Sequence, residues 1–233
     1  MRTRLPRSVC ASSSEAGPPD GTRLARDRHG MAGLLVFFAL GLRALAGDVQ
    51  ILVRDQAGRP VEGAIVWAEV AREKPPPPVQ TEIVQKNRQF IPPVIVIPVG
   101  SVVRFPNWDN VQHHVYSFSA AKTFDIPLYI GESPQAIEFE RPGIVTLGCN
   151  IHDWMAAYIV VLDTSVSAKT DAAGRALLRN LPPGPVSIFG WSPQLRGPPV
   201  QTDVSAGQSS AELSLKLRPA FRRTPPDDRG SYR

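Results

Sequence analysis

Short runs of alternating apolar and polar residues, separated by turns, dominate the chain from residue 48 to residue 191. Valine and isoleucine are frequent in the runs, and proline and glycine in the turns, which is typical of β-strands. No long segment beyond residue 47 has the 3.6-residue period of a helix, so we expect an all-β fold. The pattern predicts strands within Asp48–Val70, Val94–Ile97, Ser101–Phe105, His113–Phe118, Ala136–Glu140, Ile144–Leu147 and Ala156–Leu162.

A further group of strands is predicted after Asp163. Ala176–Leu178 is a short apolar run, and Asn180–Gly184 contains the two prolines and the glycine of a turn. The next apolar run, Val186–Trp191, is expected to complete a hairpin with Ala176–Leu178.

The first 46 residues are predicted not to belong to the fold. Met1–Gly30 is rich in arginine, serine and proline, and the nine apolar residues Leu34–Leu42 precede Ala44-Leu45-Ala46. Such a run before a small-residue site is typical of a secretory signal peptide and is too short for a transmembrane helix. We therefore expect export to the periplasm, a mature chain from about Gly47, and no later membrane span. Met31 is an alternative start of translation, and an uncleaved membrane anchor is the alternative interpretation.

The formal net charge of +5 would suit nucleic-acid binding, but the position of the charges argues against it. Residues 47–216 carry 14 basic and 16 acidic side chains, so the excess of positive charge lies in 1–46 and 217–233. The tail 217–233 is polar and proline-containing, and we expect it to be disordered. A basic groove for a phosphate backbone is therefore not the leading hypothesis, and no nucleic-acid partner is expected.

The candidate chemistry lies in the few sulfur and imidazole side chains of the mature chain. They are Cys149, Met155, His113, His114 and His152. A single cysteine forms no internal disulfide, and here a histidine and a methionine follow it within six residues. A thiolate, two imidazoles and a weak axial thioether make up the blue-copper site, whereas zinc usually collects further cysteines or histidines. The alternative is a core cysteine and methionine with incidental surface histidines.

Residues from about 80 to 162 resemble the cupredoxins. The resemblance is carried by Val96-x-x-x-Gly100-x-x-Val103-x-Phe105-x-Asn107-x-Asp109, then His113-His114-Val115, and then Pro142-Gly143 leading to Cys149. The C-x-x-H-x-x-M loop is similar to the short form of amicyanin, the partner of methylamine dehydrogenase, rather than to the longer loop of plastocyanin.

The resemblance implies one copper ion, cycling between Cu(I) and Cu(II), with His113, Cys149, His152 and Met155 as its ligands. In the family the first histidine ligand usually stands two residues before a valine, which favours His113. His114 occupies the position of an asparagine in amicyanin and plastocyanin, and it remains an alternative ligand.

The flanks resemble a different family. Asp55–Ala64 and Thr170–Gly184 are similar to the two ends of a carboxypeptidase-regulatory-like, transthyretin-type β-sandwich, and residues 71–169 separate them. We therefore expect a Greek-key cupredoxin β-sandwich of residues 80–162, inserted in a second sandwich of residues 48–70 and 164–215. A single elaborated sandwich is the alternative. Chains that pair such modules resemble methylamine-utilisation proteins.

The leading hypothesis is a periplasmic type 1 copper protein that carries single electrons between transient redox partners, a dehydrogenase or a cytochrome. Ile151 and Trp154 beside His152 are candidates for a docking patch. The alternatives are a copper-storage module and a metal-free interaction protein that uses the flanks. An enzyme is not expected, because three histidines and one cysteine are too few for the additional copper sites of oxidases and nitrite reductases. Asp109, Asp125 and Asp153 are interpreted as solvated turn residues rather than acid–base groups.

Overall fold

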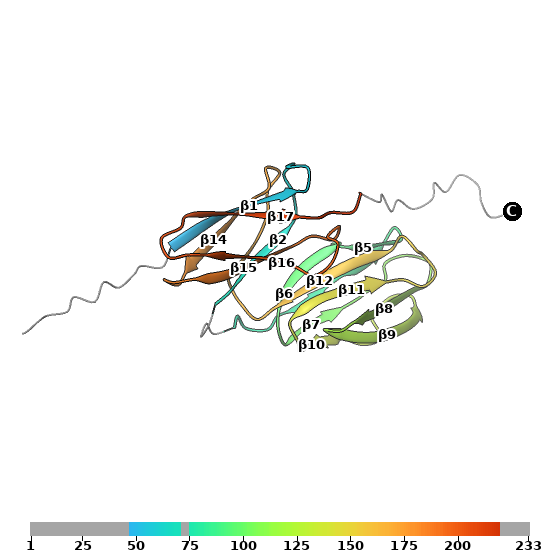
Figure 1. The fold of residues 1–233 in the computed structure, drawn as a ribbon. Coiled ribbons are helices and arrows are strands. Elements are labelled where there is room, and N and C mark those ends of the chain that lie inside the picture. The colour runs from blue at the N-terminus through green and yellow to red at the C-terminus, as the bar shows by residue number, and fades with distance from the viewer. Residues whose placement is uncertain (1–46, 71–74, 220–233) are drawn as a thin grey trace, which may run out of the picture. The chain divides into compact units, whose positions relative to one another are not determined.

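The computed structural model describes residues 47–70 and 75–219, and all regular structure in this part of the chain is β (Figure 1). The prediction of an all-β fold is confirmed. The predicted signal peptide and residues 220–233 of the predicted tail lie outside the described residues. Within the described ranges there is no helix of the length and apolarity that a membrane span requires.

Two sheets contain the strands that come first and last along the chain (Figure 1). One has the order β14 (Arg175–Leu181), β1 (Gly47–Asp55), β17 (Ser210–Leu215). The other has the order β13 (Ser167–Lys169), β2 (Ile65–Glu69), β15 (Val186–Trp191), β16 (Val200–Val204). Apolar side chains of both sheets belong to one buried cluster, so the pair forms a β-sandwich, which we call the flanking sandwich.

The strands between residues 80 and 162 form a second sandwich, which we call the central sandwich. Its larger sheet has the order β6 (Val94–Pro98), β12 (Ala156–Leu162), β11 (Gly143–Gly148), β8 (His113–Ser119), β9 (Lys122–Tyr129). Its smaller sheet has the order β10 (Ile137–Phe139), β7 (Ser101–Arg104), β3 (Gln80–Glu82). The hairpin β4 (Val84–Lys86) and β5 (Gln89–Ile91) completes it. Phe105 and Phe139 are among the largest fully buried side chains of this core.

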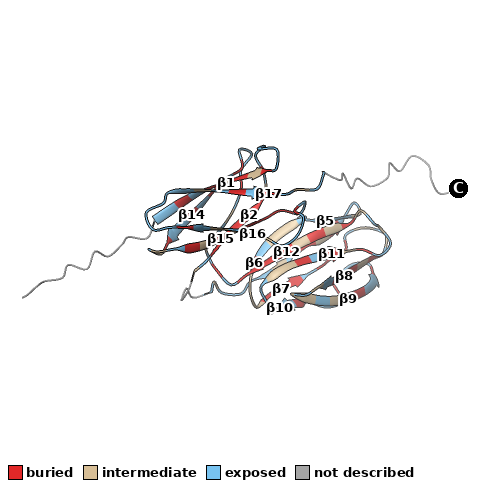
Figure 2. Ribbon diagram, in the orientation of Figure 1, coloured by how far each residue is buried: buried red, intermediate tan, exposed pale blue. Residues whose placement is uncertain are grey.

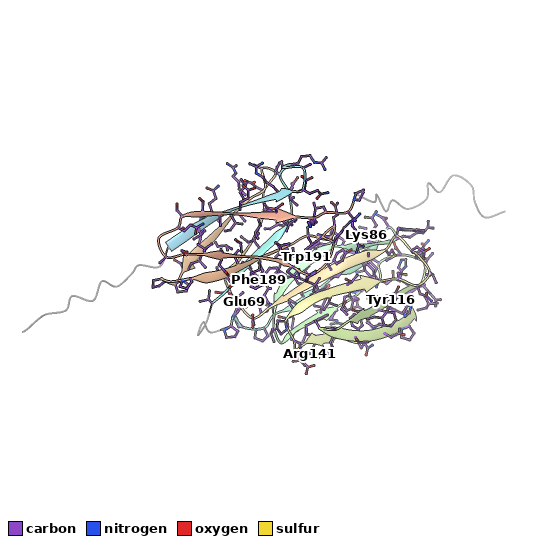
Figure 3. The ribbon with its side chains drawn as sticks, in the orientation of Figure 1. Glu69, Lys86, Tyr116, Arg141, Phe189 and Trp191 are labelled. Carbon is purple, nitrogen blue, oxygen red and sulfur yellow. The ribbon has the colours of Figure 1, made fainter. Side chains whose placement is uncertain are left out.

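Strand β12, most of whose residues are buried (Figure 2), contributes to both cores. Ala157, Ile159 and Val161 belong to the central core, whereas the alternate residues Val160 and Leu162 belong to the flanking core. A strand covered on both faces needs a continuous apolar run instead of an alternating one, and the sequence AAYIVVL provides it. On the flanking side, the ring of Tyr158 packs edge-on against Trp191, which Figure 3 labels on β15, with 5.2 Å between the centroids.

Two turns of the flanking sandwich share the sequence Asp-x-Ala-Gly-Arg and the same hydrogen bonds. In the first, Asp55 Oδ1 accepts the amides of residues 57 and 59 at 2.8 and 2.9 Å, and Arg59 Nε donates to Oδ2 at 2.8 Å. Asp171 does the same in the second, with its own arginine, Arg175, at 3.1 Å. The glycine of each turn has a positive φ, 76° and 72°, a conformation that costs glycine little.

The predicted hairpin of Ala176–Leu178 with Val186–Trp191 is wrong. Both strands exist, but β14 pairs with β1, whereas β15 pairs with β2 and β16. The turn between them carries the chain across the sandwich from one sheet to the other. Leu178 and Ile188 therefore belong to one core but come from opposite sheets, and this arrangement buries more apolar surface than a two-stranded ribbon would.

Candidate metal centre

His113 lies at the start of β8, whose side chains alternate between the core and the surface. His113, Val115 and Ser117 are buried, and the residues between them are more exposed. This alternation follows from the two-residue period of a strand, and it separates two adjacent histidines onto opposite faces. His113 is completely buried.

The loop between the antiparallel strands β11 and β12 carries the other candidate ligands. Cys149 comes directly after β11 and is 4% exposed, and Met155 comes directly before β12 and is 2% exposed. His152 is half-buried, and its carbonyl accepts the amide of Met155 at 2.9 Å in a tight turn. The pairing of the two strands therefore fixes both ends of the loop.

The structure brings His113, Cys149 and His152 together. One donor atom of each side chain lies within 4.8 Å of the other two. The Nδ1 atoms of the two histidines are 3.1 Å apart, and Cys149 Sγ is 3.8 Å from His152 Nδ1. Two imidazoles and one thiol thus converge from β8 and from the loop after β11.

The second ring nitrogen of His113 is held by a carboxylate. Nε2 lies 2.7 Å from Asp109 Oδ2, so Nε2 carries the proton and the Nδ1 lone pair faces the cluster. Burial alone would lower the pKa of His113, but its hydrogen bonds with Cys149 and Asp109 leave that pKa above its usual value.

Backbone amides surround the thiol of Cys149. Burial alone would raise the pKa of this thiol, but hydrogen bonds with the His113 side chain and with three backbone amides lower it below its ordinary value. The three amides belong to His114, Ile151 and His152. A site that favours the thiolate favours soft metal ions.

The pKa of His152 is lowered, first by burial and then by the charges of His113 and Arg88. Its imidazole is thus kept in the neutral form that binds metals.

The remaining predicted ligands lie in different environments. The Met155 side chain belongs to the same buried cluster as Cys149, and both line one surface hollow. His114 points to the opposite face of β8, where its Nε2 contacts the Asp125 carboxylate and its ring lies 5.3 Å from that of Tyr116. His114 is therefore outside the cluster that contains His113.

Asp109 is the functional residue that sequence reasoning missed, because it was interpreted as a solvated turn residue. Its side chain is only 12% exposed, and it bonds to His113, four residues later. The signal was present in Asn107-x-Asp109, since Asn107 Oδ1 accepts the Asp109 amide at 2.9 Å and fixes its direction. A local turn motif, however, does not reveal which histidine its carboxylate will reach.

The donor set fits a copper ion. Two imidazole nitrogens and a thiolate sulfur, with a buried thioether in the same core, are the ligand types that select copper. His113, Cys149 and His152 would hold the ion. Copper, when bound, supplies one-electron exchange between Cu(I) and Cu(II).

No family model matches the chain, and no curated protein is similar to it. Among solved structures, a purple cupredoxin from Nitrosopumilus maritimus is 23% identical, with a TM-score of 0.32, over 35% of this chain and 99% of that one. Amicyanin from Paracoccus versutus is 19% identical, with a TM-score of 0.32, over 41% and 97%. A copper-containing nitrite reductase from Thermus scotoductus is 24% identical, with a TM-score of 0.34, over 48% and 28%. The absence of catalysis in this chain stays a prediction.

Proposed function

We propose that this chain is an exported type 1 copper protein that carries single electrons, with the central sandwich as its copper-binding module. The observation that carries the proposal is the convergence of two imidazole Nδ1 atoms, 3.1 Å apart, beside the thiol of Cys149. Met155, buried in the same core as Cys149, would supply a weak thioether contact. A site held by strand β8 and by a loop whose two ends are fixed on paired strands would change little between oxidation states, which favours rapid electron exchange.

Exposed apolar side chains occur on the segments that carry the site, which suits a transient redox encounter. Ile151, between Cys149 and His152, is 49% exposed. Trp108, next to Asp109, is 61% exposed, and Ile130, directly after β9, is 55% exposed. We propose that a redox protein, a dehydrogenase or a cytochrome, docks on these side chains.

Visible absorption of the copper-loaded protein tests the proposal. An intense thiolate-to-copper charge-transfer band is expected on adding Cu(II), and it should be absent from Cys149→Ala. Met155→Leu should keep the band but change its position or intensity. A colourless protein that binds Cu(I) tightly would favour copper storage, and a chain that binds no copper would refute both copper functions.

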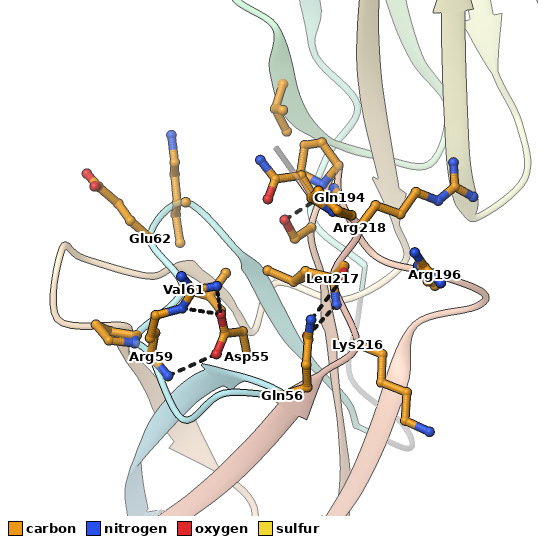
Figure 4. A pocket seen from close by; sticks show the side chains of 17 residues that line it. Asp55, Gln56, Arg59, Val61, Glu62, Gln194, Arg196, Lys216, Leu217 and Arg218 are labelled. Atoms are coloured by element: carbon orange, nitrogen blue, oxygen red, sulfur yellow. Dashed lines mark hydrogen bonds and ion pairs between the residues drawn. The ribbon is translucent and has the colours of Figure 1, made fainter. Parts of the chain in front are cut away.

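A second candidate function, binding of an acidic partner, is favoured by a groove of about 1260 Å³ in the flanking sandwich (Figure 4). Five of its lining side chains are cationic: Arg59, Lys169, Arg196, Lys216 and Arg218. Of the two carboxylates in its lining, Asp55 is paired with Arg59 at 2.7 Å, which leaves Glu62 as the only opposing charge among the described lining residues. The excess of positive charge suits an acidic polypeptide.

Binding of poly-L-glutamate at low salt tests this second function. Charge reversal of Lys169 and Arg218 together to glutamate should weaken the binding, whereas Arg141→Glu, an exposed charge of the central sandwich, should not. Equal binding by all three proteins would refute the groove as the binding surface.

A further inference from the structure

The hairpin of β4 and β5 turns through two residues in a conformation that side chains rarely adopt. Asn87 and Arg88 have φ angles of 54° and 55°, as the two central residues of a type I′ turn require. Asparagine tolerates this region, but arginine does so at a cost, and glycine is the usual residue at the second position. Contacts outside the hairpin must therefore hold the turn in place.

One of these contacts is the carboxylate of Asp109. Oδ1 accepts the amide of Asn87 at 2.6 Å, and Oδ2 accepts the amide of Arg88 at 2.8 Å. The same Oδ2 lies 2.7 Å from His113 Nε2. A single side chain thus joins the tip of the hairpin to the first imidazole of the candidate metal centre.

The other contact reaches the second imidazole. Trp154 Nε1 donates to the carbonyl of Arg88 at 3.1 Å. The Trp154 indole packs against the His152 ring with 5.2 Å between the centroids and 53° between the planes. The hairpin tip therefore contacts both Asp109, which bonds to His113, and Trp154, which packs against His152.

We propose that the Asn87–Arg88 turn is a clamp that sets both imidazoles before a metal ion arrives, with Asp109 and Trp154 as its positioning residues. Asp109 fixes the tautomer of His113 and Trp154 fixes the plane of His152, and the turn couples the two. The expected consequence of the clamp is a higher affinity for copper, and this part rests on the proposed copper function. The clamp itself is a property of the metal-free chain.

The metal-free chain, labelled with ¹⁵N-histidine, tests the first half of the clamp by nuclear magnetic resonance. His113 should be a single Nε2–H tautomer with a slowly exchanging proton. Asp109→Asn should lose that protection and give a mixture of tautomers. The matched control is Asp125→Asn, because Asp125 contacts His114 in the same way on the opposite face of β8, and only the His114 signal should change. Unchanged His113 signals in Asp109→Asn would overturn the proposal even if the chain never bound copper.

Copper affinity tests the coupling between the two positioning residues. Loss of a carboxylate that supports a ligating histidine typically weakens metal binding by about 10–100-fold, and we expect this for Asp109→Asn. Trp154→Phe keeps a ring beside His152 but removes the N–H donor, so a smaller loss is expected. If the turn couples them, the Trp154→Phe loss should nearly vanish in the Asp109→Asn background.

A matched control leaves the clamp intact. Asp125→Asn removes the carboxylate that contacts His114 on the opposite face of β8, and should bind copper within twofold of the wild type. Equal Trp154→Phe losses in both backgrounds would overturn the coupling, as would a loss in Asp125→Asn as large as that in Asp109→Asn. Failure of every variant to bind copper, with the expected His113 tautomers, would refute the copper function and leave the clamp.

Discussion

Gly148, the last residue of β11, is predicted to tolerate no side chain. It pairs with Tyr116 of β8, and a Cβ built on it would lie 2.7 Å from Tyr116 Cζ and 2.8 Å from Oη. Carbon atoms in contact normally stay about 3.5–4.0 Å apart, so the tyrosine ring or the strand must move. The rings of His114 and Phe118 lie 5.3 and 5.2 Å from the Tyr116 ring on either side and restrict its movement along the strand. We therefore expect Gly148→Ala to lower the free energy of unfolding by about 1–3 kcal/mol.

Urea denaturation of the metal-free protein measures this effect, and a double-mutant cycle with Tyr116→Ala assigns it. In the Tyr116→Ala background the ring is absent, so Gly148→Ala should cost at least about 1 kcal/mol less than in the wild type. Equal costs in the two backgrounds would refute the steric argument. Because Gly148 directly precedes Cys149, the single variant should also weaken the thiolate-to-copper band.

Three further predictions concern the stability of each sandwich and of the site. Phe105→Ala, which empties a fully buried position, should cost about 3–5 kcal/mol in denaturant titrations, whereas Phe118→Ala, at a ring 79% exposed, should change stability by less than about 0.5 kcal/mol. The amide and guanidinium of Arg59 hold the pKa of Asp55 below its usual value, so the wild type should be more stable than Asp55→Asn at neutral pH, and the difference should shrink as the pH falls below about 4. Copper at about 100 times its dissociation constant should stabilise the wild type by about 2.7 kcal/mol in thermal unfolding, and the same concentration should do much less for His152→Ala.

The strands that sequence reasoning found are those with a clear apolar pattern. It missed β9, whose sequence KTFDIPLY is mixed and contains Pro127. A proline is tolerated there because β9 is the edge strand of its sheet, where a lost amide donor breaks no ladder. It also missed β17, although the buried residues Leu213 and Leu215 alternate with polar ones.

Which strands pair was harder to predict than where they lie, because pairing depends on contacts far apart in sequence. β1 and β17 pair in parallel although more than 150 residues separate them, and no local sequence motif predicts this pairing. The division into a central module of residues 80–162 and a discontinuous flanking module stays a prediction about folding units. The sheets follow the same segments, but the buried cluster of the flanking sandwich also includes Val160 and Leu162 of β12.

Much of the candidate site could be predicted because its residue types are scarce. With one cysteine and three histidines after residue 47, few combinations exist, and the two-residue period of β8 separates His113 from His114. The roles of the residues that hold the two histidines in place could not be predicted in the same way. Asp109 and Trp154 act through a hairpin tip more than 60 residues from the loop of Cys149, and only the fold brings these segments together.

The two-faced burial of β12 limits how this protein can be taken apart. If residues 80–162 were produced without the flanking sandwich, Tyr158, Val160 and Leu162 would be exposed to water. They would form an apolar stripe that promotes aggregation, on the strand that directly follows the Cys149–Met155 loop. A minimal copper module would therefore require polar substitutions at these three positions. For the same reason, a substitution at any buried residue of this strand disturbs the packing of one of the two cores.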